Sequence, residues 1–186
     1  LGRMGRFPPA RTGHGSRRMI RFARALAVAV LLAAVGPVPA GSAAEPSLRV
    51  GTTPPKVVLK DLQGFPVKIP EDVRGKIAVV HFWTDYCNFC LVEMPAMENL
   101  YRKYSGRGLV ILAVNVGQKK ELVKAFVNNI RVTYPVLLDH DMKVTGRYGV
   151  DAVPRTYFLD RNGVIRYRIL GDATEEDLGH LVRSLL

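Results

Sequence analysis

The sequence predicts an α/β domain in which helices flank a central mixed β-sheet, with a β-hairpin at its N-terminal end. Two apolar runs, Ile77–Trp83 and Leu109–Val116, are typical of buried strands. A stretch with helical periodicity lies between them, which gives a β-α-β unit. Near the C-terminus, Asn162-Gly163 is a strong signal for a two-residue turn, so the last two strands form an antiparallel hairpin. A β-α-β beginning followed by a hairpin requires a mixed sheet.

The other elements follow in chain order from the same patterns. Short strands at Val57–Lys60 and Phe65–Ile69 surround a turn and make the N-terminal hairpin. Helical spacing turns Leu91 of one helix and Leu122 of the next toward the core. Thr174 precedes the last helix as its N-cap. Helices are expected at Leu91–Tyr104, Lys119–Asn129, Met142–Tyr148 and Thr174–Leu185, and further strands at Val136–Leu138, Thr156–Leu159 and Val164–Leu170.

The positive charge of the chain is concentrated at its N-terminus. The 186 residues carry a formal net charge of +11, from 27 Lys and Arg against 16 Asp and Glu. Seven of the 27 lie in residues 1–44, which contain no acidic residue, so residues 45–186 hold 20 basic and 16 acidic side chains, a net charge of +4. A nucleic-acid-binding domain carries its positive excess on the folded part. The distribution therefore argues against a nucleic-acid partner.

Residues 1–44 have the pattern of an export segment. A basic stretch precedes an apolar run of 11 residues, Ala25–Val35, and small residues follow as far as Ala44. This order is typical of a secretory signal peptide cleaved after Ala44, and a start at Met19 would give a compact signal of the same kind. The alternative is an uncleaved membrane anchor, although a spanning helix needs about 20 apolar residues and Gly36-Pro37 interrupts this run.

We therefore expect residues 45–186 to form one domain that is exported to the periplasm or another extracytoplasmic compartment. The domain would be membrane-anchored if the segment before it is not cleaved. Disulfide chemistry is available in such a compartment. The chain has only two cysteines, which excludes a disulfide scaffold and a four-cysteine zinc site.

The chemistry is indicated by Cys87-Asn88-Phe89-Cys90, which lies between a buried strand and a helix. At this junction Cys87 sits at the helix N-terminus, where free N–H groups and the helix dipole stabilise a thiolate. Cys90 lies on the same side of the helix and can resolve a mixed disulfide formed on Cys87. Glu93 follows one turn later, and its spacing alone is typical of a solvated carboxylate. The pattern predicts a redox dithiol that needs no cofactor or metal.

The order and spacing of several further segments resemble one family over about Val50 to Leu185. The matching segments are His81-Phe82-Trp83, Cys87-x-x-Cys90, Glu93-Met94-Pro95, Ala113–Val116, Tyr134-Pro135-Val136, Tyr148-Gly149-Val150, Val153-Pro154 and Thr156–Asp160. They resemble the thioredoxin-fold thiol:disulfide oxidoreductases of the TlpA/ResA/CcmG group, and the ResA-like members in particular. The resemblance implies a thioredoxin-like fold and a protein that reduces apocytochrome c thiols before haem attachment.

The resemblance also assigns roles to individual residues. It implies that Cys87 attacks, that Cys90 resolves, and that Glu93 takes part in the proton chemistry of the dithiol. It implies that Pro154 is a cis-proline that faces the dithiol and offers extended backbone to the client. The expected client-binding residues are Trp83, Tyr86, Val153 and Pro154. The expected partners are client protein thiols, apocytochrome c among them, and a membrane thiol-electron donor, and we expect a monomer.

Four residues depart from the family pattern, and one of them is Tyr86, which replaces the commoner tryptophan. Phe89 stands where most members have proline, so an additional N–H and a bulky ring lie beside Cys87. His81 occupies the position of a buried acid in thioredoxin, and the interpretation as a core residue is favoured over a proton relay. Arg155 replaces a threonine, and we expect it to be a surface charge that selects acidic clients.

Three other functions compete with a dithiol reductase. A copper carrier would use the two thiolates with Met94 or Met97, although exported carriers of this fold use a wider cysteine spacing. A peroxiredoxin-like peroxidase matches Thr84-x-x-Cys87, but Val80 replaces the proline of that motif and a separate resolving cysteine is missing. An oxidant that installs disulfides differs from a reductase in potential, which the motif does not fix.

Overall fold

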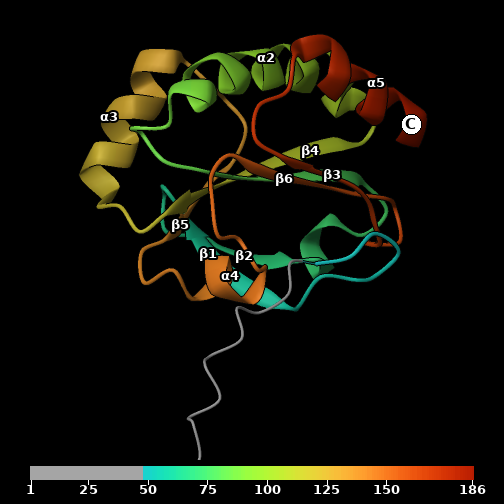
Figure 1. Ribbon diagram of the computed structural model, residues 1–186, viewed down its shortest axis with the longest axis horizontal. Helices are drawn as coiled ribbons and strands as arrows, with labels where there is room; N and C mark the ends of the chain where they lie inside the picture. Colours follow the sequence, from blue (N-terminus) through green and yellow to red (C-terminus); the bar gives the residue numbers. More distant parts are fainter. Residues whose placement is uncertain (1–47) are drawn as a thin grey trace, which may run out of the picture. The chain divides into compact units, whose positions relative to one another are not determined.

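The computed structural model describes residues 48–186, which fold into one seven-stranded mixed sheet with helices on both faces (Figure 1). The predicted export segment lies outside these residues. The strands are β1 (Val57–Asp61), β2 (Pro66–Ile69), β3 (Ile77–Trp83), β4 (Leu109–Val116), β5 (Val136–Asp139), β6 (Arg155–Leu159) and β7 (Ile165–Leu170). The helices are α2 (Asn88–Tyr104), α3 (Lys120–Ile130), α4 (Lys143–Arg147) and α5 (Glu175–Leu185), with short 3-10 turns η1 (Glu71–Val73) and η2 (Ser105–Arg107).

The sheet order is β2-β1-β5-β4-β3-β6-β7, which places the dithiol strand β3 near the middle. Strands β3, β4 and β5 are parallel, since right-handed crossovers through α2 and α3 connect them. Strand β6 runs antiparallel to β3. After the Asp160–Gly163 turn, β7 pairs antiparallel with β6. The hairpin of β1 and β2 extends the other edge by pairing with β5. The predicted mixed sheet and N-terminal hairpin are both confirmed.

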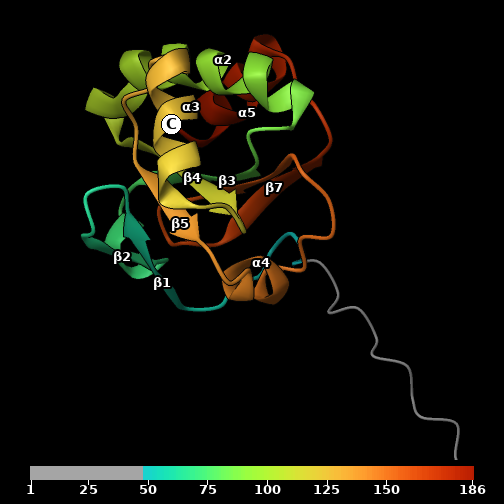
Figure 2. The same cartoon turned by 90° about the vertical axis from the view of Figure 1, so that its left-hand side faces the viewer.

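Strand β3 is buried along its whole length because both faces of the sheet are covered. Ile77, Val79 and Trp83 pack against α2, α3 and α5 on one face. Ala78 and Phe82 pack on the other face against α4 and the β1–β2 hairpin. Figure 2 shows α2, α3 and α5 above the sheet and α4 below it. The C-terminal end of β3 is thus a rigid platform for the segment that carries the cysteines.

Helix periodicity identified the buried faces with two exceptions. Leu91 was expected in the core, but it is 43% exposed, because the side chain that enters the core from the first turn of α2, which begins at Asn88, is that of Cys90. Leu122, in the first turn of α3, is 52% exposed, and the buried residues of that helix are Val123 and Val127. The predicted cap of α5 is confirmed as a capping box, in which Thr174 accepts from the Asp177 N–H.

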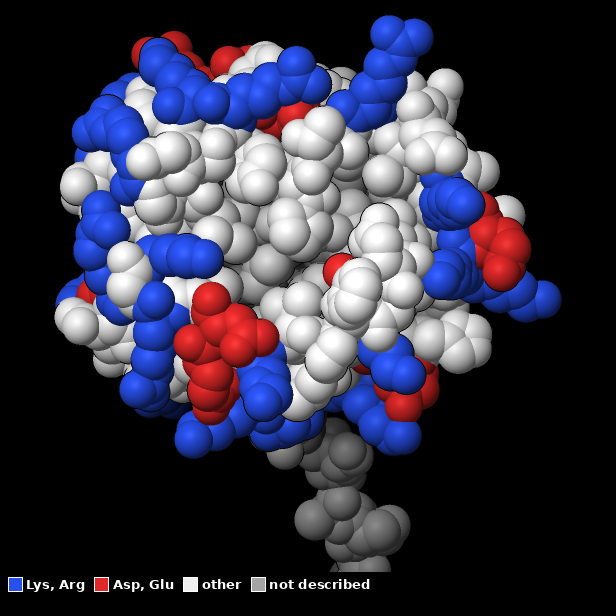
Figure 3. Space-filling view, turned by 180° about the vertical axis from the view of Figure 1, so that it is seen from behind, with Lys and Arg blue, Asp and Glu red and all other residues white. Residues whose placement is uncertain are grey.

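Two surface properties bear on possible partners. Within residues 48–186, no helix is long and apolar enough to span a bilayer. Seen from behind in Figure 3, the Lys and Arg side chains are spread around the rim of the molecule and interrupted by Asp and Glu. That face therefore lacks the continuous basic stripe that nucleic-acid-binding domains use.

Candidate active site

The two cysteines lie at the junction between β3 and α2. After Trp83 the chain makes a turn in which the Cys87 N–H donates to the Thr84 carbonyl at 3.3 Å. Cys87 is then the N-cap of α2, and its Sγ accepts from the Cys90 N–H at 3.3 Å. A disulfide joins the two sulfur atoms, so the structure is that of the oxidised protein.

The two cysteines differ in their exposure to solvent. Cys87 is 8% exposed, whereas Cys90 is fully buried in the core between α2 and the sheet. A thiolate at Cys87 would face the free N–H groups of the first helical turn, which lower a thiol pKa. The geometry therefore favours Cys87 as the sulfur that an external molecule reaches first.

Glu93 lies one helical turn beyond Cys90 and is only 2% exposed, contrary to a solvated carboxylate. Burial and the nearby charge of Asp172 raise its pKa to about 7, and the backbone N–H of Ala173 offsets part of this rise. Neither carboxylate oxygen has a hydrogen-bond partner of good geometry among residues 48–186. A buried carboxyl whose pKa lies near neutrality is suited to proton transfer.

A groove of about 500 Å³ runs beside the first turns of α2, against the segment that connects β7 to α5. Its apolar lining includes Phe89 and Val92, which are 55% and 75% exposed. Its acidic lining consists of Glu93, Asp172 and Glu175. The groove therefore combines exposed apolar surface with carboxylates next to the dithiol.

The predicted client-binding residues lie at different depths. Tyr86 is 75% exposed directly before Cys87. Trp83 differs from the expectation of client contact: it is fully buried and its ring lies 4.8 Å from that of Phe126, so it supports the cysteine loop from below. The Val153–Pro154 bond is cis, as the resemblance implied. The register of β6 against β3 places Pro154 beside the end of β3, where the cysteine loop begins.

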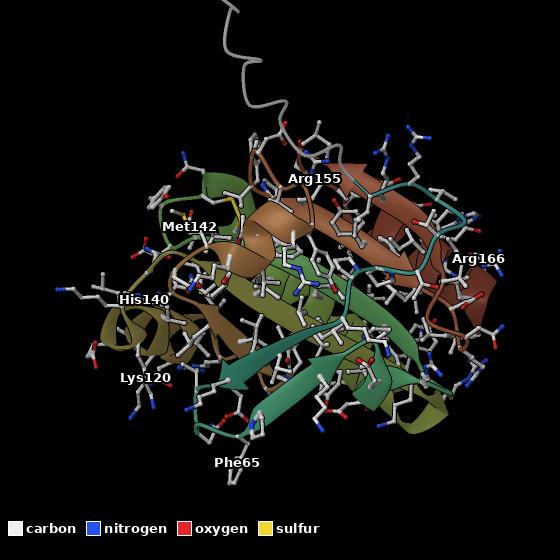
Figure 4. The ribbon with its side chains drawn as sticks, turned by 90° about the horizontal axis from the view of Figure 1, so that it is seen from below. Phe65, Lys120, His140, Met142, Arg155 and Arg166 are labelled. Carbon is white, nitrogen blue, oxygen red and sulfur yellow. A yellow bond between two sulfur atoms is a disulfide. The ribbon has the colours of Figure 1, made fainter. Side chains whose placement is uncertain are left out.

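His81 and Arg155 lie on opposite faces of the sheet. His81 is fully buried on the α2 side, with its Nδ1 2.9 Å from the Thr156 hydroxyl, and burial lowers its pKa to about 3. It is therefore a neutral core residue, as favoured from the sequence. Arg155 was expected at the surface, but it is 4% exposed because β6 is covered on that side and Asp151 pairs with its guanidinium (Figure 4).

Sequence reasoning missed two residues near the cysteines, Asp172 and Gln118. Asp172 reaches Glu93 from a loop 79 positions later, and Gln118 contacts Asp85 from the loop after β4. Neither residue belongs to a motif, and a loop-to-loop contact leaves no periodic signal in the sequence. Gln118 follows the predicted strand Leu109–Val116 by two residues, at the edge where β3 also ends, and this position is the one signal for it.

The comparisons with known proteins agree with this geometry. Residues 50–168 match the model of the AhpC/TSA family. The chain is 38% identical to the thiol-disulfide oxidoreductase ResA of Geobacillus thermodenitrificans over 139 residues, which cover 75% of this chain and 79% of that protein. It is 34% identical to ResA of Bacillus subtilis over 133 residues, covering 72% and 74%. The thioredoxin domain of a thiol-disulfide oxidoreductase from Bacteroides vulgatus superposes with a TM-score of 0.67 at 26% identity, covering 74% of this chain and 98% of that one.

Proposed function

The chain belongs to the AhpC/TSA family and is a ResA-type thiol-disulfide oxidoreductase with Cys87 and Cys90 as its redox pair, and from this premise we propose that it reduces disulfides in exported client proteins. The observation that carries the proposal is the position of Cys87 as the N-cap of α2, with the fully buried Cys90 bonded to it. Apocytochrome c is the client class that we propose, because the curated relatives are ResA proteins.

The reaction begins from the reduced protein. The Cys87 thiolate attacks one sulfur of the client disulfide, which forms a mixed disulfide and releases the other client sulfur as a thiolate. The Cys90 thiolate then attacks the Cys87 sulfur, closes the Cys87–Cys90 disulfide and releases the second client thiolate. Two electrons pass to the client, and a membrane thiol-electron donor restores the dithiol.

Glu93 supplies the proton chemistry of the second step in this proposal. Cys90 is fully buried, so its thiol needs a nearby base before it can attack. Glu93 lies one turn away with a pKa raised to about 7, so near neutrality it exists both as a base and as an acid. The ionised carboxylate can accept the Cys90 proton, and the resulting carboxylic acid can return it during the reverse reaction.

The client would dock along the backbone at Val153 and Pro154 and beside Tyr86. The adjoining groove is apolar at Phe89 and Val92 and acidic at its far side. We therefore propose that clients carry apolar or basic residues next to the disulfide, since charge complementarity favours them. The buried Trp83 holds the loop in place.

The proposal also includes the location of the protein. The basic and apolar pattern of residues 1–44 supports export, and residues 45–186 would form the thioredoxin-like domain that acts outside the cytoplasm. Such a domain works as a monomer if the dithiol face is to remain open to clients.

The reduction potential of the Cys87/Cys90 pair tests the direction of the reaction. A value near that of thioredoxin, about −270 mV, supports a reductase, and one near about −120 mV would make the protein an oxidant instead. Cys90→Ser should accumulate client proteins in reductant-sensitive adducts on Cys87, whereas Cys87→Ser should accumulate none. Equal trapping by the two variants would overturn the assignment of the attacking thiol.

A further inference from the structure

Gln118 connects two loops at the end of the sheet that carries the cysteines. Its Oε1 accepts from the backbone N–H of Asp85 at 2.9 Å, and its Nε2 donates to Asp85 Oδ1 at 2.5 Å. The amide nitrogen of Asn115 donates to the same Oε1 at 2.7 Å. One side chain therefore holds both the backbone and the carboxylate of Asp85, which lies two residues before Cys87.

The orientation of the Gln118 amide follows from its neighbours. The Asp85 N–H can only donate, so the atom facing it must be an acceptor. The Asp85 carboxylate, when ionised, can only accept, so the atom facing it must be a donor. A flipped amide would oppose donor to donor and acceptor to acceptor at these two places. Both contacts select the same orientation, and the pairing specifies an amide at position 118.

Gln118 is in turn fixed to the sheet. Asn115 is 1% exposed at the end of β4 and pairs in register with Trp83, the last residue of β3. The backbone carbonyl of Gln118 lies 3.5 Å from the His140 Nδ1, from the loop after β5. Figure 4 shows His140 on the same side of the molecule as Lys120, the first residue of α3. The anchor of Asp85 is therefore tied to structure that does not depend on the disulfide.

The Asp85 contact matters most when the disulfide is open. In the oxidised protein a covalent bond ties Cys87 to Cys90 and hence to α2. In the dithiol this bond is absent, and the Thr84–Cys87 turn is held by the Cys87 N–H to Thr84 bond and by the contacts of Gln118 with Asp85. Removing the Gln118 contacts therefore costs the reduced form more than the oxidised form.

We propose that Gln118 is a positioning residue that holds the Asp85 turn, and with it Cys87, in the reduced protein. The inference rests on the proposed function only in that Cys87 is the reactive sulfur of the redox pair. It requires neither a particular client nor a particular direction of electron flow.

Four variants of the full chain test the proposal by equilibration with reduced and oxidised glutathione. Gln118→Glu sets two carboxylates against each other, and like charges repel. We expect its equilibrium constant for reduction to fall about fivefold, which is about 20 mV more negative at 29.6 mV per tenfold. Gln118→Ala adds no charge and should fall about threefold. Asp85→Asn should change the constant less than twofold, because its amide can still accept from Gln118.

The double variant Asp85→Asn/Gln118→Glu reverses the donor and the acceptor. Its equilibrium constant for reduction should return to within twofold of wild type. Gln118→Glu should move the pH profile of Cys87 alkylation by iodoacetamide to higher pH, and the double variant should restore the wild-type profile. Gln63→Glu, in the exposed turn between β1 and β2, is the matched control for an added charge. The proposal is overturned if Gln118→Glu stays within twofold of wild type, or if the double variant is as impaired as Gln118→Glu. Failure of Cys90→Ser to trap clients would instead contradict the proposed function and leave these glutathione measurements unaffected.

Discussion

The buried carboxyl of Glu93 makes the stability of the oxidised protein depend on pH in an unusual direction. In the unfolded chain this carboxyl ionises near pH 4.5, whereas in the folded protein it ionises at about 7. A group whose pKa is raised by folding contributes stability that is complete below the unfolded pKa and is lost as the pH rises through the folded pKa. Wild-type protein should therefore lose stability between about pH 4.5 and 7 on account of Glu93.

The size of this loss follows from the two pKa values. Each pH unit between them changes the free energy of unfolding by ~1.36 kcal/mol, so the interval from 4.5 to about 7 amounts to ~3 kcal/mol at most. Glu93→Gln does not titrate and lacks this term. A buried amide without partners adds a constant cost, so the slope against pH is informative and the offset is not.

Urea unfolding of the oxidised protein at half-unit steps from pH 4 to 8 measures the slope, and the intact disulfide keeps the thiols from titrating. The stability of Glu93→Gln relative to wild type should rise by ~3 kcal/mol across this range. Parallel curves for the two proteins would refute the reasoning.

Glu98, on the same helix as Glu93, provides a control because its contribution to stability depends on pH in the opposite direction. Burial favours its neutral form, but Arg102 and Thr133 donate to it at 2.7 Å and outweigh burial, so its pKa is lowered. Its contribution is present at neutral pH and disappears as the pH falls through its folded pKa. Glu98→Gln should therefore be less stable than wild type at pH 7, and the difference should shrink toward pH 4.

Two further predictions concern stability. Thr174→Ala removes the hydroxyl that accepts from the Asp177 N–H at the start of α5, and it should lower the free energy of unfolding by ~1 kcal/mol in urea melts; a change below a few tenths would show that the capping box is not maintained in solution. A chain that begins at Glu45 should unfold in one cooperative transition, because both cores described for residues 48–186 lie within it; a broad, non-cooperative melt would contradict an export role for residues 1–44.

The sequence predicted most of the fold because its signals are local. The apolar runs at Ile77–Trp83 and Leu109–Val116 coincide with β3 and β4, since central strands buried on both faces need continuous apolar residues. The dithiol was predicted from a motif and its spacing, and the cis Val153–Pro154 bond was implied by the family resemblance. Arg155 was misplaced because its burial depends on what covers β6 in the folded chain, and neither helical nor strand periodicity predicts its pairing with Asp151.

The site was predicted less completely than the fold, for the same reason. Helical spacing placed Glu93 one turn from Cys90, but a solvated and a buried carboxylate have the same spacing. The loop with Asp172 and Ala173 decides between them by closing over Glu93, and that loop is 79 positions away in the chain. Gln118 likewise acquires its contact with Asp85 only when β3 and β4 are paired.

The hairpin of β1 and β2 is joined to the rest of the sheet by a short ladder. Among the described residues, β1 pairs with β5 only at Lys60 and Asp61, whereas β3 and β4 are in register from end to end. The hairpin is therefore held largely by the packing of Val57, Leu59 and Ile69 on the α4 face of the sheet, and its amides should exchange with solvent hydrogen before those of β3. The cysteines pack on the opposite face of the sheet, so fraying of the edge strand β2, or its pairing with another chain, takes place away from the dithiol.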